Sequence, residues 1–169
     1  MSHFALQSKN VIVNDNGNSE MVAACVEIKD QLIHAIHPYG SKLSCQVIDY
    51  AEHVIMPGLV DSHVHINEPG RTEWEGFNTA TQAAAAGGIT ALVDMPLNCI
   101  PVTTTKAAFA EKLAAVDDKL WVDCGFWGGV IPQNIADLDD LLNAGVLGVK
   151  SFLIDSGIAE FPNVAAQDI

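Results

Sequence analysis

The chain changes character at residues 57–65, which read Pro57-Gly58-Leu59-Val60-Asp61-Ser62-His63-Val64-His65. The apolar residues at the start of this stretch and the polar residues at its end predict a buried strand over residues 59–66. Two imidazoles lie near the carboxyl end of this strand. Side chains alternate along a strand, so His63 and His65 point to the same face. Two convergent imidazoles are a common start to a metal site. Asp61 is two residues before His63 and therefore lies on the same face of the strand. We expect its carboxylate to hold one of these imidazoles in position without binding the metal itself.

Beyond this strand, the sequence alternates between helical and strand patterns. Predicted helices cover residues 73–86, 106–116 and 135–143, and predicted strands cover residues 89–95, 120–126 and 146–154. The strands recur at intervals of roughly 30 residues, which is the size of a βαβ unit. Such alternation predicts a parallel sheet with helices packed against it.

Two parallel architectures fit this alternation. A doubly wound sheet usually has a glycine-rich phosphate loop after its first strand, whereas Gly87-Gly88 lies before a strand. A TIM (β/α)8 barrel instead carries polar residues at the carboxyl ends of its strands, where this chain has Asp94 and Asp155. We therefore predict a barrel. Residues 57–169 hold fewer than four βα units, and a full barrel needs ~250 residues, so only the first half is present.

Local signals set the predicted helix ends. Residues 72–75, Thr-Glu-Trp-Glu, form a capping-box pattern that predicts a helix starting at Glu73. Gly87-Gly88 is expected to end that helix. Thr104 or Thr105 is expected to cap the next one.

Residues 1–56 have a different pattern, that of short strands punctuated by Asn, Asp, Gly and Pro. Strands are predicted over residues 4–6, 11–13, 22–28, 32–36, 47–48 and 54–56, with a tight connection at residues 29–31. We interpret the segment as a small antiparallel β region, too thin to be stable alone.

Composition excludes several classes of protein. The 169 residues are 49% hydrophobic and 17% charged, which predicts a packed core. The formal net charge of −13, with Arg71 as the only arginine, argues against nucleic-acid and anionic-membrane partners. No apolar run approaches the ~18 residues of a membrane span. Four dispersed cysteines, with no CxxC pair, indicate reduced thiols in an intracellular protein.

Lys150 is unusual because it lies within the otherwise apolar residues 148–154. Burial disfavours its charged form and lowers its pKa. A neutral amine can react with CO2 to form an anionic carbamate, which can bridge two metal ions. Taken alone, an ammonium that reaches solvent is the better interpretation. Beside His63 and His65, the metal-ligand interpretation is favoured.

These motifs together resemble a known group. Residues 57–65 are similar to the metal-binding opening of the cyclic amidohydrolases, within the amidohydrolase superfamily. Residues 66–77, Ile-Asn-Glu-Pro-Gly-Arg-Thr-Glu-Trp-Glu-Gly-Phe, resemble the allantoinases. Dihydroorotases generally have, in place of Asn67, an Arg that holds the substrate carboxylate. Residues 94–98, 124–130 and 148–153 also resemble allantoinases.

The resemblance implies a hydrolase with two divalent metal ions, usually zinc. His63 and His65 would bind one ion, and carboxylated Lys150 would bridge both. A metal-bridging hydroxide would hydrolyse a ring amide of allantoin to give allantoate. Two further His ligands and the catalytic Asp would come from strands beyond Ile169, so no catalytic residue is expected within this chain.

The same resemblance implies a domain organisation and a set of partners. Residues 1–56 would be the first part of a composite β-sandwich, and residues 57–169 the first half of the barrel. We expect a homotetramer. We also expect an intracellular location, most simply the cytoplasm, with an organelle as the alternative. A fragment on its own is expected to be poorly soluble or partly unfolded.

Weaker candidates and alternatives stay open at this point. Asn98 and Arg71 are candidate substrate contacts, although pairing of Arg71 with Glu68 or Glu75 is the simpler expectation. Dihydroorotate and hydantoins or dihydropyrimidines are alternative substrates. A catalytically incomplete relative that acts as a scaffold or regulator is the alternative function.

Overall fold

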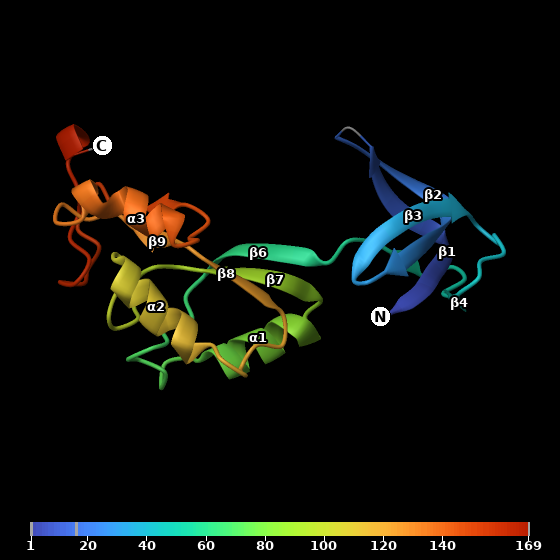
Figure 1. Ribbon diagram of the computed structural model, residues 1–169. Helices are drawn as coiled ribbons and strands as arrows, with labels where there is room; N and C mark the ends of the chain where they lie inside the picture. Colours follow the sequence, from blue (N-terminus) through green and yellow to red (C-terminus); the bar gives the residue numbers. More distant parts are fainter. Residues whose placement is uncertain (1, 16, 169) are drawn as a thin grey trace. The chain divides into compact units, whose positions relative to one another are not determined.

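The computed structural model describes residues 2–15 and 17–168, which divide into two compact units. The first unit covers residues 1–57 and the second covers residues 58–169. Figure 1 shows the helices and strands of each unit.

The first unit is a single sheet with the order β3-β2-β1-β4, and β5 also pairs with β1. Its strands are β1 (His3–Asp15), β2 (Asn18–Lys29), β3 (Leu32–Pro38), β4 (Gln46–Asp49) and β5 (Val54–Ile55). The pairs β1–β2 and β2–β3 are antiparallel, whereas β4 and β5 run parallel to β1. The prediction of a purely antiparallel region was therefore wrong. β2 occupies one edge of β1, so the chain after β3 crosses to the other edge of β1. The strands β4 and β5 that follow pair there in the parallel direction.

Local backbone features explain the long strands of this unit. The predicted strands 4–6 and 11–13 are one strand, β1, with a register irregularity between Ser8 and Val11. The Ser8 hydroxyl donates a hydrogen bond to the carbonyl of Ala51 at 3.0 Å and fixes the irregular segment. The predicted tight connection is confirmed, since Asp30 and Gln31 have φ values of 51° and 68°, as in a two-residue hairpin loop.

The second unit is built from parallel strands that pair in chain order. The strands β6 (Leu59–Val64), β7 (Ile89–Asp94) and β8 (Asp123–Phe126) form one sheet in the order β6-β7-β8. The helices α1 (Phe77–Ala86) and α2 (Lys106–Ala115) connect them. Next come β9 (Gly128–Gly129), the short helices η1 (Ile135–Asp137) and α3 (Leu138–Asn143), β10 (Val149–Lys150) and η2 (Ala166–Asp168). β10 is parallel to β9.

The two long helices begin by different means. Thr105 caps α2 as predicted, because its hydroxyl accepts a hydrogen bond from the Ala108 amide at 3.1 Å. The predicted start of α1 at Glu73 was wrong, since this helix begins at Phe77. Its first amide donates to Oε2 of Glu68 at 2.9 Å, so a carboxylate from the preceding loop replaces the expected capping box. Gly87 ends α1 as expected.

Two predicted strands are shorter than expected. Residues 120–126 contribute only β8, and residues 146–154 contribute only β10. The chain after Lys150 leaves the sheet because the Phe152 carbonyl accepts a hydrogen bond from the amide of Val164 at 2.8 Å. A backbone group that pairs with this later segment cannot also extend β10.

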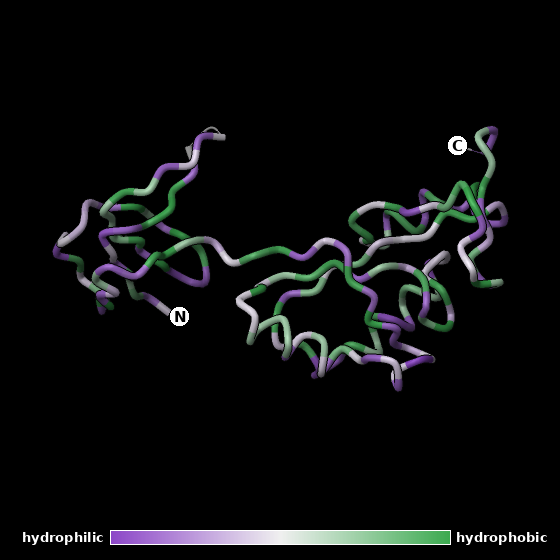
Figure 2. The backbone as a smooth tube through the Cα atoms, turned by 180° about the vertical axis from the view of Figure 1, so that it is seen from behind, coloured by the Kyte–Doolittle hydropathy of each residue, from purple (hydrophilic) through white to green (hydrophobic). Residues whose placement is uncertain are grey.

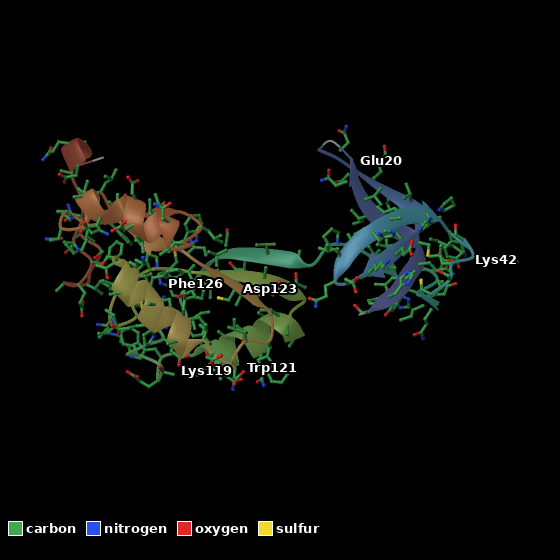
Figure 3. All side chains as sticks on the ribbon, in the orientation of Figure 1. Glu20, Lys42, Lys119, Trp121, Asp123 and Phe126 are labelled. Carbon is green, nitrogen blue, oxygen red and sulfur yellow. The ribbon has the colours of Figure 1, made fainter. Side chains whose placement is uncertain are left out.

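An apolar cluster between sheet and helices stabilises the second unit. Phe126 lies at the end of β8 (Figure 3). It makes edge-to-face contacts with Phe77 of α1 and Phe109 of α2, with ring centroids 6.1 and 5.7 Å away. Burying each such side chain contributes about 1.5–3 kcal/mol. Hydrophobic and hydrophilic stretches alternate along the backbone of this unit (Figure 2), as expected for elements with one buried face. Within the described residues, no helix has the length and apolarity to cross a membrane.

Candidate metal centre

His63 and His65 lie together at the carboxyl end of β6. Their ring centroids are 5.6 Å apart, and the ring planes are inclined by 46°. His63 is exposed, whereas His65 is half-buried. The predicted convergence of the two imidazoles is therefore present, with one ring open to solvent.

The surroundings of His65 disfavour the charged form of its imidazole. Burial lowers its pKa, and the positive charges of Lys150 and His63 lower it further. A side-chain nitrogen of Asn98 lies 3.3 Å from Nδ1 of His65, so the amide fixes the orientation of the ring. A neutral imidazole offers a lone pair to a metal ion without first losing a proton.

Lys150, on β10, lies near enough to His65 for its charge to lower the pKa of that imidazole. It pairs with Gly129 of β9, and its carbonyl accepts a hydrogen bond from the amide of Val130 at 2.8 Å. Its Nζ lies 5.0 Å from the centroid of the Phe152 ring, and burial lowers the pKa of the amine. The lysine is half-buried rather than enclosed in a central strand. Its amine therefore has both a lowered pKa and access to small molecules in solvent.

Asp61 has a different contact from the one that its parity suggested. Its Oδ1 accepts a hydrogen bond from the backbone amide of His63 at 3.1 Å. The carboxylate thus fixes the main chain at His63 rather than contacting an imidazole ring.

Arg71 and Asn98 come from two loops that follow neighbouring strands. Nη1 of Arg71 donates to the carbonyl of Asn98 at 3.2 Å, and Nη2 contacts Glu160 at 3.1 Å. The expected pairing of Arg71 with Glu68 or Glu75 was wrong. Glu68 is buried and already accepts hydrogen bonds from the first amide of α1 and from Lys119. Arg71 therefore supports the backbone of the loop that carries Asn98.

A buried ion pair lies directly behind the histidines, and sequence reasoning missed it. Asp94, at the end of β7, and Lys112, on α2, are 0% and 1% exposed, and their side chains form an ion pair. Oδ1 of Asp94 also accepts a hydrogen bond from the amide of Ile66 at 2.8 Å, one residue after His65. Burial raises the pKa of Asp94, and the charge of Lys112 opposes that shift. The sequence feature that pointed to this pair was the helical spacing, which places Lys112 on the same buried face as Ala108 and Phe109.

Trp127 joins the strands that surround the site. Its backbone amide donates to the carbonyl of Asp94, and its indole Nε1 donates to the carbonyl of Ser62, both at 2.9 Å. Its ring packs on Gly148, where an added Cβ would lie only 2.4 Å from the indole. Trp127 thus fixes the backbone on both sides of the two histidines.

The donor set fits a divalent metal ion. It combines two imidazoles at one strand end, one of them with a lowered pKa, and an amine of lowered pKa that can become an anionic oxygen ligand. Nitrogen and oxygen donors of this kind suit zinc and similar ions.

Parallel strands in chain order, with such a donor set at their carboxyl ends, are typical of α/β proteins whose functional site lies at that end of the sheet. Residues 54–166 match the amidohydrolase family. The chain belongs to this family.

Similar proteins of known name cover nearly all of this chain. It is 52% identical over 166 residues to a probable allantoinase of Oryza sativa, with 95% of this chain and 32% of the relative covered. It is 46% identical over 172 residues to the allantoinase of Saccharomyces cerevisiae, with 98% and 37% covered. The chain therefore spans about a third of the length of these relatives.

A solved structure has a similar fold. The L-hydantoinase (dihydropyrimidinase) from Arthrobacter aurescens matches with a TM-score of 0.87 and 29% identity. The match covers 99% of this chain and 37% of the hydantoinase. The described part of the chain thus has a fold similar to part of that protein.

Proposed function

We propose that this chain is the amino-terminal part of a metal-dependent hydrolase that converts allantoin and water to allantoate. The observation that carries the proposal is the pairing of His63 with His65, with Lys150 near enough for its charge to act on His65, within a chain 46–52% identical to proteins named allantoinase. The placement of these side chains supports the metal site, and the names of the relatives support the substrate.

The architecture proposed for the whole protein follows from the strand order. Residues 57–169 would be the first half of a (β/α)8 barrel, and residues 1–56 the first part of a composite β-sandwich. Support comes from parallel pairing in chain order and from apolar side chains left in solvent. Leu59, Val60 and Leu147 are 52%, 66% and 65% exposed, as expected where further barrel strands and helices would pack.

His63 and His65 would hold one metal ion, and Lys150 would bridge it to a second after carboxylation. In that reaction the neutral amine nitrogen bonds to the carbon of CO2 and releases a proton to solvent. The uncharged amine thereby becomes a negatively charged carbamate. When bound, two zinc-class ions would acidify a water nucleophile and polarise the ring carbonyl. Asn98 and the Asp94–Lys112 pair keep His65 and the following backbone in place.

Asn67 supports a substrate without a carboxylate. It is neutral and buried, and its Oδ1 has no hydrogen-bond partner within the described part of the chain. Dihydroorotate carries a carboxylate that needs a cationic partner, whereas allantoin has none. Asn67 and the Arg71-supported loop therefore favour a neutral ureide over dihydroorotate.

The experiment measures bound metal and the turnover of allantoin, hydantoin and dihydroorotate by the protein that carries these residues. His63→Asn together with His65→Asn is expected to remove bound metal and turnover, whereas His53→Asn, an exposed histidine of the first unit, serves as the matched control. Intact-mass measurement at neutral pH should show one CO2 adduct that Lys150→Met lacks. Retention of metal by the double variant would refute the ligand assignment. Turnover of dihydroorotate without allantoin would refute the substrate.

We also propose an intracellular, homo-oligomeric protein. The four cysteines are free thiols in the described residues, which suits a reducing compartment. The exposed apolar side chains of the second unit need cover, which the rest of the chain and neighbouring subunits would supply together.

A further inference from the structure

A second group of metal-binding side chains lies in the first unit. His3 of β1, Glu27 of β2 and Cys45, just before β4, offer one ligand atom each. These atoms all lie within 4.8 Å of one another. No residue of this group takes part in the candidate metal centre described above.

Strand register explains why His3 and Glu27 meet. Glu27 pairs with Ala5 on one side and with Ala35 on the other. His3 is two residues from Ala5 and shares its face of the sheet. Ala5 and Ala35 carry only methyl groups and leave space beside Glu27. The longer side chain of His3 can therefore reach the carboxylate of Glu27.

The parallel pairing of β4 with β1 brings in the thiol. Gln46 pairs with Phe4, so Cys45 arrives beside His3 at the edge of the same sheet. Cys45 is half-buried, and His3 has 35% of its side chain exposed. The cluster is therefore formed by three strands and stays accessible to an ion from solvent.

Both oxygens of Glu27 are already oriented. Oε1 lies 2.7 Å from Nε2 of His3, and Oε2 lies 2.7 Å from Nε2 of His37. Only 13% of the Glu27 side chain is exposed. A carboxylate fixed by a neighbouring imidazole is the usual support of a metal ligand.

We propose that His3, Glu27 and Cys45 bind one divalent transition-metal ion of the zinc class, with His37 holding Glu27 through its second oxygen. A thiolate and an imidazole favour zinc over calcium or magnesium. Ligand atoms around tetrahedral zinc lie about 3.5 Å apart, so binding needs side-chain movements on the order of 1 Å. Cys45 loses its proton to solvent on binding, and water completes the fourth position.

The test is a titration of the whole chain with cobalt(II), used as a coloured substitute for zinc. A thiolate ligand gives a near-ultraviolet charge-transfer band that the imidazole and carbamate ligands of the other centre cannot give. The band is expected at one equivalent and should disappear in Cys45→Ser. Glu27→Gln is expected to weaken binding by ~10–100-fold. Cys124→Ser, the same change at a half-buried cysteine of the second unit, is expected to keep the band.

Alkylation of the unmodified chain gives a measurement that needs no variant. Zinc is expected to slow iodoacetamide labelling of Cys45 by about 10-fold or more, and to leave labelling of Cys124 unchanged. Absence of the cobalt band, its persistence in Cys45→Ser, or equal labelling of Cys45 with and without zinc would overturn the proposal. The last result would identify the cluster as a hydrogen-bonded group only.

Discussion

Replacing Lys112 with Met tests the buried ion pair behind the candidate metal centre. The substitution keeps most of the side-chain volume but leaves the carboxylate of Asp94 without its partner. Asp94 is fully buried, and its carboxylate otherwise accepts hydrogen bonds from backbone amides, including that of Ile66. Loss of one partner of a buried pair costs about 3–5 kcal/mol. We expect a loss of this size in the free energy of unfolding, measured by urea denaturation.

The pH dependence of the Lys112→Met variant gives a second readout. Burial already raises the pKa of Asp94, and removal of Lys112 raises it further. The unfolded chain releases the Asp94 proton at a lower pH than the folded chain. Stability is therefore retained below the unfolded pKa of about 3.9 and is lost as pH rises through the folded pKa, by up to about 1.4 kcal/mol per pH unit.

A double variant and a surface control isolate the cause. Lys112→Met with Asp94→Asn removes the unpaired charge, so it should be more stable than Lys112→Met alone by about 1–3 kcal/mol. Lys106→Met, an exposed change on the same helix, should stay within about 0.5 kcal/mol of the unmodified chain. A loss below about 1 kcal/mol for Lys112→Met, or a double variant no more stable than the single one, would refute the reasoning.

Three further outcomes are expected. Glu68→Ala removes the acceptor of the first amide of α1 and should cost about 0.5–2 kcal/mol in thermal unfolding, and an unchanged Tm would contradict this capping role. Gly129→Ala should cost about 1–3 kcal/mol, because its Cβ would lie 2.4 Å from an aromatic ring, whereas Gly87→Ala meets nothing closer than 3.4 Å and should cost less. The imidazole of His65 should titrate below its ordinary pKa of about 6.5 in a histidine NMR titration, so it charges, and destabilises the fold, only on acidification. Lys150→Met should raise that pKa, and an unaltered midpoint would show that the charge of Lys150 does not act on His65.

Periodic patterns predicted the elements of the second unit well. The strands that begin at Leu59 and Ile89 and the helix capped by Thr105 were located from alternation and one capping residue. The start of α1 was not, because its cap is Glu68, which lies outside the local sequence window of a capping box. Tertiary contacts of this kind leave no periodic signal.

In the candidate site, too, some residues could be predicted from the local sequence and others could not. His63 and His65 were recognisable because their spacing on one strand fixes their common face. Asp94 and Lys112 were not, since an apolar helix face that includes one lysine is read as solvated unless its partner strand is known. The mixed sheet of the first unit was missed because pairing of β4 with β1 depends on a crossover, which the local sequence does not encode.

In the second unit, paired strands are neighbours in the chain, and this has a consequence for biosynthesis. Leu59 pairs with Ile89, Ala91 pairs with Asp123, and Gly128 pairs with Val149. Each βα unit thus finds its neighbour soon after it leaves the ribosome, without waiting for a distant segment. The strand pairs next to His63, His65 and Lys150 therefore join segments that are close in the sequence, which favours their early formation.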